Sequence, residues 1–173
     1  PVLAATLLAD GSSEISNCPA LSDVEASAAI LRYLGCRVEQ QGDCVTVNTA
    51  GLCRNDVPDQ LMREMRSSIV FLGAISARMG EAHLTFPGGC ELGPRPIDLH
   101  LAALRKLGVE IEEERGRLNC RVNGRLKGTT ITLAFPSVGA TENVLLAAVL
   151  AEGTTEIVNA AREPGIVDLC AYL

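Results

Sequence analysis

The stretch Leu8-Ala-Asp-Gly-Ser-Ser-Glu-Ile-Ser-Asn17 decides the fold, because it returns almost position by position as Leu150-Ala-Glu-Gly-Thr-Thr-Glu-Ile-Val-Asn159. A weaker third copy is Ala77-Arg-Met-Gly-Glu-Ala-His-Leu-Thr-Phe86. The copies lie about seventy residues apart, a spacing at which several repeated units must pack together to make one core. The sequence therefore predicts one domain, or most of one, built from repeated units.

An apolar helix is predicted at the start of each unit. These helices are expected over 2–8, 68–77 and 143–150, where apolar residues follow one another on all sides. A helix that is apolar all round is typically buried all round. The three helices are therefore expected to form the inner part of the molecule.

A second, amphipathic helix is predicted after each repeated stretch and a loop. Helices over 23–34 and 98–107 are expected to end at Leu-Gly pairs, since Gly favours the left-handed turn that follows a helix. We expect Asp23, Asp98 and Asp168 to open the second helix of the three copies.

Polar hairpins are predicted to close the first two copies, over 37–47 and over 110–122. Their strands alternate apolar and polar residues, so one face of each sheet should meet water. The expected fold class is α/β, with apolar helices inside and sheets outside. The chain begins inside the first helix of one copy and stops inside the second helix of another, so we expect residues 1–173 to be most of one domain, clipped at both ends.

Composition excludes several classes of protein. The hydrophobic fraction of 47% suffices for a sizeable core, and the net charge of −6 without a basic run argues against nucleic-acid binding. The longest apolar runs are about eight residues, too short to span a bilayer, so no membrane insertion is expected.

The seven cysteines include no C-x-x-C pair, a pattern that fits neither a disulfide framework nor a zinc site. We expect reduced thiols in a cytoplasmic protein, with Cys36, Cys120 and Cys170 buried as small apolar side chains. The two histidines are far apart in the sequence, and neither a metal nor another cofactor is expected.

One stretch is rich in chemistry: Phe86-Pro-Gly-Gly-Cys-Glu-Leu-Gly-Pro-Arg-Pro-Ile-Asp-Leu-His100. Its glycines and prolines predict an exposed loop that leads into a helix near Pro96. Cys90 lies five residues from Arg95, and positive charge stabilises a thiolate. Cys90 is therefore a candidate catalytic residue; the alternative is a buried structural thiol.

This loop, the repeat and four further segments resemble the enolpyruvyl transferase family. The further segments are Met65-Arg-Ser-Ser68, Gly124-Arg-Leu-Lys-Gly128, Phe135-Pro-Ser-Val-Gly-Ala-Thr-Glu-Asn143 and Asn159-Ala-Ala-Arg-Glu-Pro164. The resemblance implies an inside-out α/β barrel of two similar domains, with the active site in the cleft between them. This chain would be the domain that carries the cysteine loop, and the partner domain would lie outside it.

The resemblance also implies a reaction. The cysteine loop is similar to that of members that transfer the enolpyruvyl group of phosphoenolpyruvate to the 3′-hydroxyl of UDP-N-acetylglucosamine, the first committed step of peptidoglycan precursor synthesis. In these members the cysteine at the position of Cys90 protonates the enol carbon, can add to phosphoenolpyruvate, and is alkylated by fosfomycin. Two alternatives are a catalytically silent sugar-nucleotide-binding relative and an interaction scaffold, but neither needs a thiol at this place.

Substrate-binding residues follow from the same resemblance. The nucleotide segment is Arg95, Pro96, Ile97, Asp98 and Leu99. Arg95 can donate two hydrogen bonds to phosphate oxygens. Asp98 can accept one from a uracil N–H; its alternative role is a helix cap.

Two further places are expected to touch substrate. The second nucleotide segment is Phe135, Pro136, Ser137, Val138 and Gly139; the alternative for Ser137 is a helix N-cap. Arg66 precedes a buried helix, where an arginine and a helix N-terminus together attract anions; its alternative is a surface salt bridge.

Overall fold

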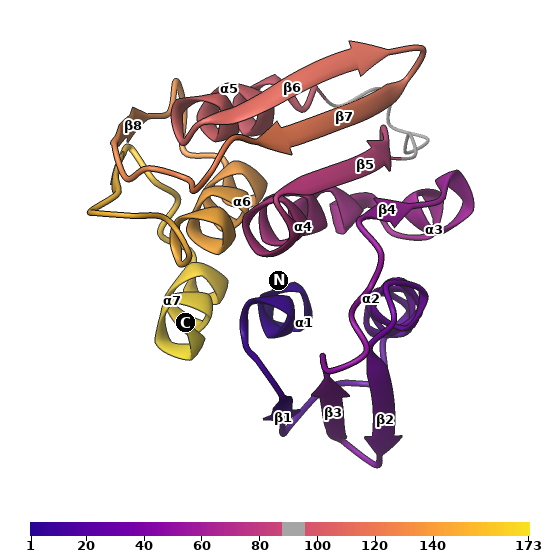
Figure 1. The fold of residues 1–173 in the computed structure, drawn as a ribbon. Helices are drawn as coiled ribbons and strands as arrows, with labels where there is room; N and C mark the ends of the chain where they lie inside the picture. Colours follow the sequence, from indigo (N-terminus) through magenta and orange to yellow (C-terminus); the bar gives the residue numbers. More distant parts are fainter. Residues whose placement is uncertain (88–95) are drawn as a thin grey trace.

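The computed structural model describes residues 1–87 and 96–173, which contain the three expected copies (Figure 1). The first copy comprises α1 (Val2–Ala5), the 3-10 helix η1 (Thr6–Leu8), β1 (Ser12–Ile15), α2 (Ser22–Tyr33), β2 (Arg37–Gln41) and β3 (Cys44–Asn48). The second comprises β4 (Asp56–Val57), α3 (Asp59–Glu64), the 3-10 helix η2 (Arg66–Val70), α4 (Phe71–Met79), β5 (Glu81–Thr85), α5 (Asp98–Lys106), β6 (Val109–Glu114) and β7 (Arg117–Val122). The third comprises β8 (Thr130–Thr132), α6 (Val138–Ala148), β9 (Glu156–Val158) and α7 (Pro164–Tyr172).

The predicted hairpins and helices are confirmed, although α6 begins at Val138 rather than at 143 and the short helix α3 was not predicted. Two further differences concern short strands and the start of α7. First, a short strand precedes the buried helix of the second and third copies, and β4 and β8 pair in parallel with β5 and β9. Strands of two or three residues are too short to show an alternating pattern, so the sequence did not reveal them. Second, Asp168 does not open its helix, because α7 begins at Pro164, a residue well suited to the first helical turn.

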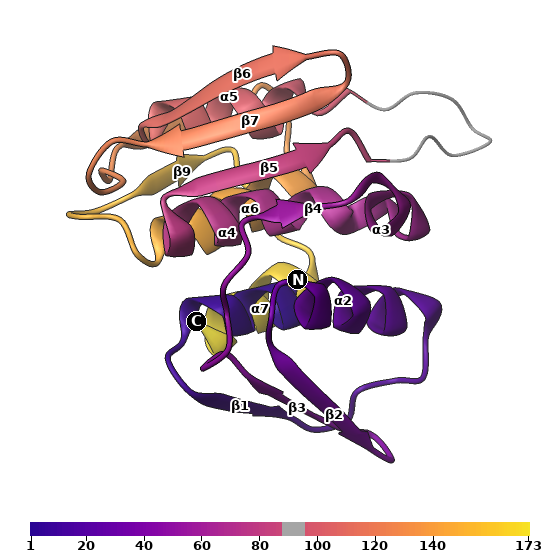
Figure 2. The same ribbon diagram turned by 45° about the vertical axis from the view of Figure 1, so that its right-hand side comes forward.

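Three small sheets surround the helices. Their strand orders are β1-β3-β2, β4-β5-β7-β6 and β8-β9. Figure 2 shows the three-stranded sheet on one side and the four-stranded sheet on the other, with α1, α2, α4, α6 and α7 between them. The arrangement of helices inside and sheets outside is therefore confirmed.

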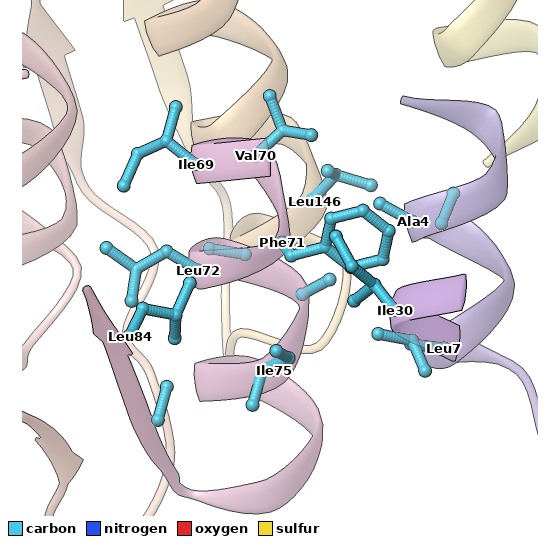
Figure 3. Close-up of a cluster of buried hydrophobic side chains, with 14 of the residues drawn as sticks. Ala4, Leu7, Ile30, Ile69, Val70, Phe71, Leu72, Ile75, Leu84 and Leu146 are labelled. Carbon is cyan, nitrogen blue, oxygen red and sulfur yellow. The ribbon is translucent and has the colours of Figure 1, made fainter. Parts of the chain in front are cut away.

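The core is formed where the apolar helices meet. Phe71 of α4 is 1% exposed and points toward Ala4 of α1, Ile30 of α2 and Leu146 of α6 (Figure 3). Burying an aromatic side chain of this size stabilises the fold by about 1.5–3 kcal/mol. One residue thus joins helices from all three copies.

The backbone conformation explains why the sequence of residues 8–17 recurs at 77–86 and 150–159. Its glycine has a positive φ in every copy: 100° at Gly11, 76° at Gly80 and 85° at Gly153. The stretch ends at an asparagine that is also left-handed in two copies, with φ of 56° at Asn17 and 61° at Asn159. Glycine and asparagine adopt this conformation most readily, so the same turn demands the same residues.

The described cysteines are all free thiols. Cys36 and Cys120 are buried as predicted, and burial raises their pKa values to about 11 and about 12. Cys170 is exposed, so that prediction was wrong; Ile166 and Leu169 are the residues that α7 buries. No helix in 1–87 or 96–173 is long and apolar enough to cross a membrane.

Candidate functional site

The predicted substrate-binding residues lie at the starts of three helical segments. Pro96–Leu99 lead into α5, Phe135–Gly139 lead into α6, and Arg66 begins η2. Cys90 and Arg95 lie outside the described residues, so their roles stay predictions.

The start of α5 leaves a carboxylate at the surface. Ile97, not Asp98, is the N-cap, and the N–H of Leu101 donates to the carbonyl of Ile97 at 3.1 Å. Asp98 is exposed in the first turn, where the helix dipole favours a negative charge. Its side chain makes no hydrogen bond to another described residue. The helix-cap role for Asp98 is therefore not observed.

The start of α6 is fixed by Ser137. Its Oγ accepts from the N–H of Ala140 at 3.3 Å, which confirms the N-cap role. The hydroxyl of Thr141 donates to the carbonyl of Ser137 at 2.7 Å and accepts from the N–H of Ala161 at 3.1 Å. The first turn of α6 is therefore anchored both to itself and to the segment before α7.

Two features at the start of α6 suit a ligand. Phe135 is 58% exposed and Val138 is 38% exposed, so apolar surface is available to a planar ring. The first N–H groups of a helix have no partner within the helix, so those of Val138 and Gly139 are suited to an anion. Together they can receive both an apolar and a negatively charged part of one ligand.

Arg66 is half-buried at the first position of η2. Within 1–87 and 96–173 it forms no ion pair, so the surface salt bridge that was its alternative is not found there. Its guanidinium remains suited to an anionic ligand.

One residue, Asn143 of α6, brings the three segments together. Its Oδ1 accepts from the N–H of Gly73 in α4 at 2.6 Å, and its Nδ2 donates to the carbonyl of Ile69 in η2 at 2.9 Å. The same Nδ2 lies 3.1 Å from Nδ1 of His100 in α5. Asn143 is completely buried, so these bonds join η2, α4, α5 and α6 without competition from water.

His100 completes this junction. It is 8% exposed, and burial lowers its pKa to about 4, although the negative charge of Asp98 partly opposes the change. The ring is therefore neutral near pH 7. Sequence reasoning assigned no role to His100 or Asn143. The only signal was that these polar residues end the segments 86–100 and 135–143, which resemble the family.

Two hollows lie elsewhere, with volumes of about 450 and 350 Å³. Thr85, Arg117 and Asp59 line both of them, beside the ends of β5 and β7. Neither contains a predicted substrate-binding residue. The candidate site is thus an exposed face formed by the starts of η2, α5 and α6.

Comparison with known proteins identifies the family. The family model described as EPSP synthase (3-phosphoshikimate 1-carboxyvinyltransferase) matches residues 1–173. The chain therefore belongs to this family of enolpyruvyl transferases.

Among curated proteins, the chain is 52% identical over 173 residues to UDP-N-acetylglucosamine 1-carboxyvinyltransferase 2 of Caldanaerobacter subterraneus subsp. tengcongensis. It is 47% identical over 173 residues to the UDP-N-acetylglucosamine 1-carboxyvinyltransferase of Acinetobacter baylyi. Each alignment covers 100% of this chain and 41% of the relative. The chain thus spans about two fifths of the length of the curated relatives it matches.

Solved structures share the fold. The enolpyruvyl transferase NikO from Streptomyces tendae aligns with a TM-score of 0.85 at 23% identity, over 99% of this chain and 40% of that one. EPSP synthase from Acinetobacter baumannii aligns with a TM-score of 0.72 at 22% identity, over 96% and 40%. The expected enolpyruvyl transferase fold is therefore confirmed.

Proposed function

We propose that residues 1–173 are most of the cysteine-loop domain of a UDP-N-acetylglucosamine 1-carboxyvinyltransferase. Relatives of that name are 46–52% identical over the whole chain, which supports this choice within the family. The observation that carries the proposal is the junction at Asn143, which joins the segments that begin with Arg66, Pro96 and Phe135. Peptidoglycan precursor synthesis and a cytoplasmic location belong to this proposal and rest on the resemblance and the cysteine pattern.

In the proposed reaction, the enol carbon of phosphoenolpyruvate takes a proton from the Cys90 thiol. The 3′-oxygen of UDP-N-acetylglucosamine attacks the neighbouring carbon and gives a tetrahedral intermediate. That intermediate then loses phosphate and a proton to leave the enolpyruvyl ether. A second domain would supply the base and further phosphate ligands, because catalysis needs both sides of the cleft.

The described residues have defined tasks in this scheme. The α6 N–H groups and Arg66 attract the anionic parts of the substrates, since a helix N-terminus and a guanidinium both favour negative charge. Asp98 accepts a hydrogen bond from the uracil ring, and the exposed ring of Phe135 offers it an apolar surface. Fosfomycin would alkylate Cys90, as the resemblance implies.

A second candidate is transfer to shikimate 3-phosphate, which the name of the family model and the EPSP synthase structures favour. Isothermal titration calorimetry on the complete protein separates the two. We expect UDP-N-acetylglucosamine to bind and shikimate 3-phosphate not to bind.

A substitution makes this experiment sharper. Arg95→Ala should weaken UDP-N-acetylglucosamine binding by about 1.5–3 kcal/mol, the range for a charge-assisted hydrogen bond. Arg95→Lys should restore it only in part, since the planar fork is lost. Arg121→Ala is the matched control, because Arg121 pairs with Glu81 on the outer sheet. Binding of shikimate 3-phosphate, or an unchanged dissociation constant for Arg95→Ala, would contradict the proposal.

A further inference from the structure

We infer that His100 is a positioning residue that sets the spacing between the two nucleotide-binding segments, Pro96–Leu99 and Phe135–Gly139, through its contacts with Asn143 and Gly139. The role rests on the proposed nucleotide site and adds a residue to it. His100 itself is not required to touch the substrate.

The first step is the orientation of the Asn143 amide. The backbone N–H of Gly73 needs an acceptor, and the backbone carbonyl of Ile69 needs a donor. Only one orientation of the amide satisfies both, with Oδ1 toward Gly73 and Nδ2 toward Ile69. The NH2 group of Asn143 therefore also faces His100.

The second step is the state of the imidazole ring. Because Nδ2 of Asn143 is a donor, Nδ1 of His100 must accept the 3.1 Å hydrogen bond and carry no proton. A neutral ring then has its proton on Nε2. Protonation of Nδ1 would place two donors against each other, so this contact requires the neutral ring.

The third step is the contact on the far edge of the ring. A Cβ built on Gly139 would lie 3.0 Å from Cε1 and 3.3 Å from Nε2 of His100, closer than side-chain atoms normally approach. The ring is therefore packed directly against the backbone of the second residue of α6. One edge of His100 is bonded to Asn143 and the other abuts Gly139, and both of these belong to α6.

The consequence for the site follows from the chain. His100 comes directly after Leu99, so the ring links the first turn of α5 to the first turn of α6. Moving the ring moves one nucleotide-binding segment relative to the other. A side chain at position 139 would meet the edge of the ring, which would have to shift by a few tenths of an ångström to make room.

A double-mutant cycle in the complete enzyme tests this role. His100→Asn keeps an acceptor near the position of Nδ1 but lacks the edge formed by Cε1 and Nε2. We expect Gly139→Ala alone to raise the dissociation constant for UDP-N-acetylglucosamine about tenfold, and to raise it much less in the His100→Asn background. Arg121→Ala, on the outer sheet away from the candidate site, is the control and should leave binding unchanged.

Enzyme kinetics and NMR add measurements that separate a positioning role from a general loss of structure. The KM for UDP-N-acetylglucosamine should rise in Gly139→Ala while kcat stays within about twofold, as for loss of uniform binding. Nitrogen-15 NMR of the wild-type ring should find the proton on Nε2 in the absence of any nucleotide. If His100→Asn does not fold, His100→Gln takes its place in the cycle.

The outcomes are distinct. Equal effects of Gly139→Ala in both backgrounds, or a proton on Nδ1, would overturn the positioning role while nucleotide binding by the wild type still upholds the proposed function. A wild-type enzyme that fails to bind UDP-N-acetylglucosamine would overturn the proposed function, and the positioning role with it.

Discussion

Helices α2 and α5 occupy the same place in two copies of the repeat, yet only α5 belongs to the candidate site. Each ends at a glycine with a positive φ, 104° at Gly35 and 101° at Gly108. Arg32 donates to the carbonyl of Val38 at 3.2 Å, and Arg105 donates to the carbonyl of Ile111 at 3.4 Å. The end of the helix and the strand that follows it are thus built alike in both copies.

The difference lies at one buried position, eight residues before each glycine. In α2 this position is Ser27, whose hydroxyl donates to the carbonyl of Asp23 in its own helix at 2.7 Å and lies 3.5 Å from Sδ of Met65. In α5 it is His100, whose ring reaches Asn143 in the third copy at 3.1 Å. The repeat therefore explains the scaffold, and a departure from the repeat lies where the candidate site is proposed.

The largest expected effect comes from breaking the junction that α5 has and α2 lacks. Asn143→Leu would leave the N–H of Gly73 and Nδ1 of His100 buried without their hydrogen-bond partners, each at a cost of about 1–3 kcal/mol. We expect the free energy of unfolding to fall by about 4 kcal/mol for Asn143→Leu and by no more than about 1 kcal/mol for Ser27→Ala. Urea denaturation of both variants measures this. Similar losses for the two variants would mean that the junction adds nothing to the common scaffold.

A smaller effect is expected from pH, and again only α5 should produce it. The pKa of His100 falls from 6.5 to about 4 on folding, so between these values the unfolded chain binds a proton that the folded chain does not. Stability should therefore be complete above pH 6.5 and should decrease as the pH falls toward 4, by at most about 3 kcal/mol. His100→Asn should make the decline shallower, whereas Ser27→Ala should leave its slope unchanged. Equal slopes in the wild type and His100→Asn would refute the assignment to His100.

Much of the scaffold could be predicted from the sequence, because it depends on local patterns. The buried helices follow from continuous apolar residues, the turns at Gly11 and Gly153 from the repeat, and the N-cap at Ser137 from its place before an apolar run. Cys170 was misjudged because an apolar neighbourhood in sequence does not say which side of a helix is covered.

The junction could not be predicted, because it depends on contacts between distant residues. Asn143 bonds to Gly73 and Ile69, which lie about seventy residues earlier in the chain, and no local pattern encodes such a pairing. The sequence placed Pro96–Leu99 and Phe135–Gly139 in two separate motifs. The packing of His100 against Gly139 and its hydrogen bond with Asn143 reveal that the two segments lie side by side.

Phosphate release by the complete enzyme tests the central claim most directly, namely that this chain supplies the catalytic thiol and the nucleotide contacts of an enolpyruvyl transferase. We expect release only when phosphoenolpyruvate and UDP-N-acetylglucosamine are both present. Cys90→Ala should reduce its rate at least about a hundredfold, as for loss of a general acid, while replacement of the exposed Cys53 by Ala should not. Full activity in Cys90→Ala, or release with shikimate 3-phosphate in place of the sugar nucleotide, would contradict the account.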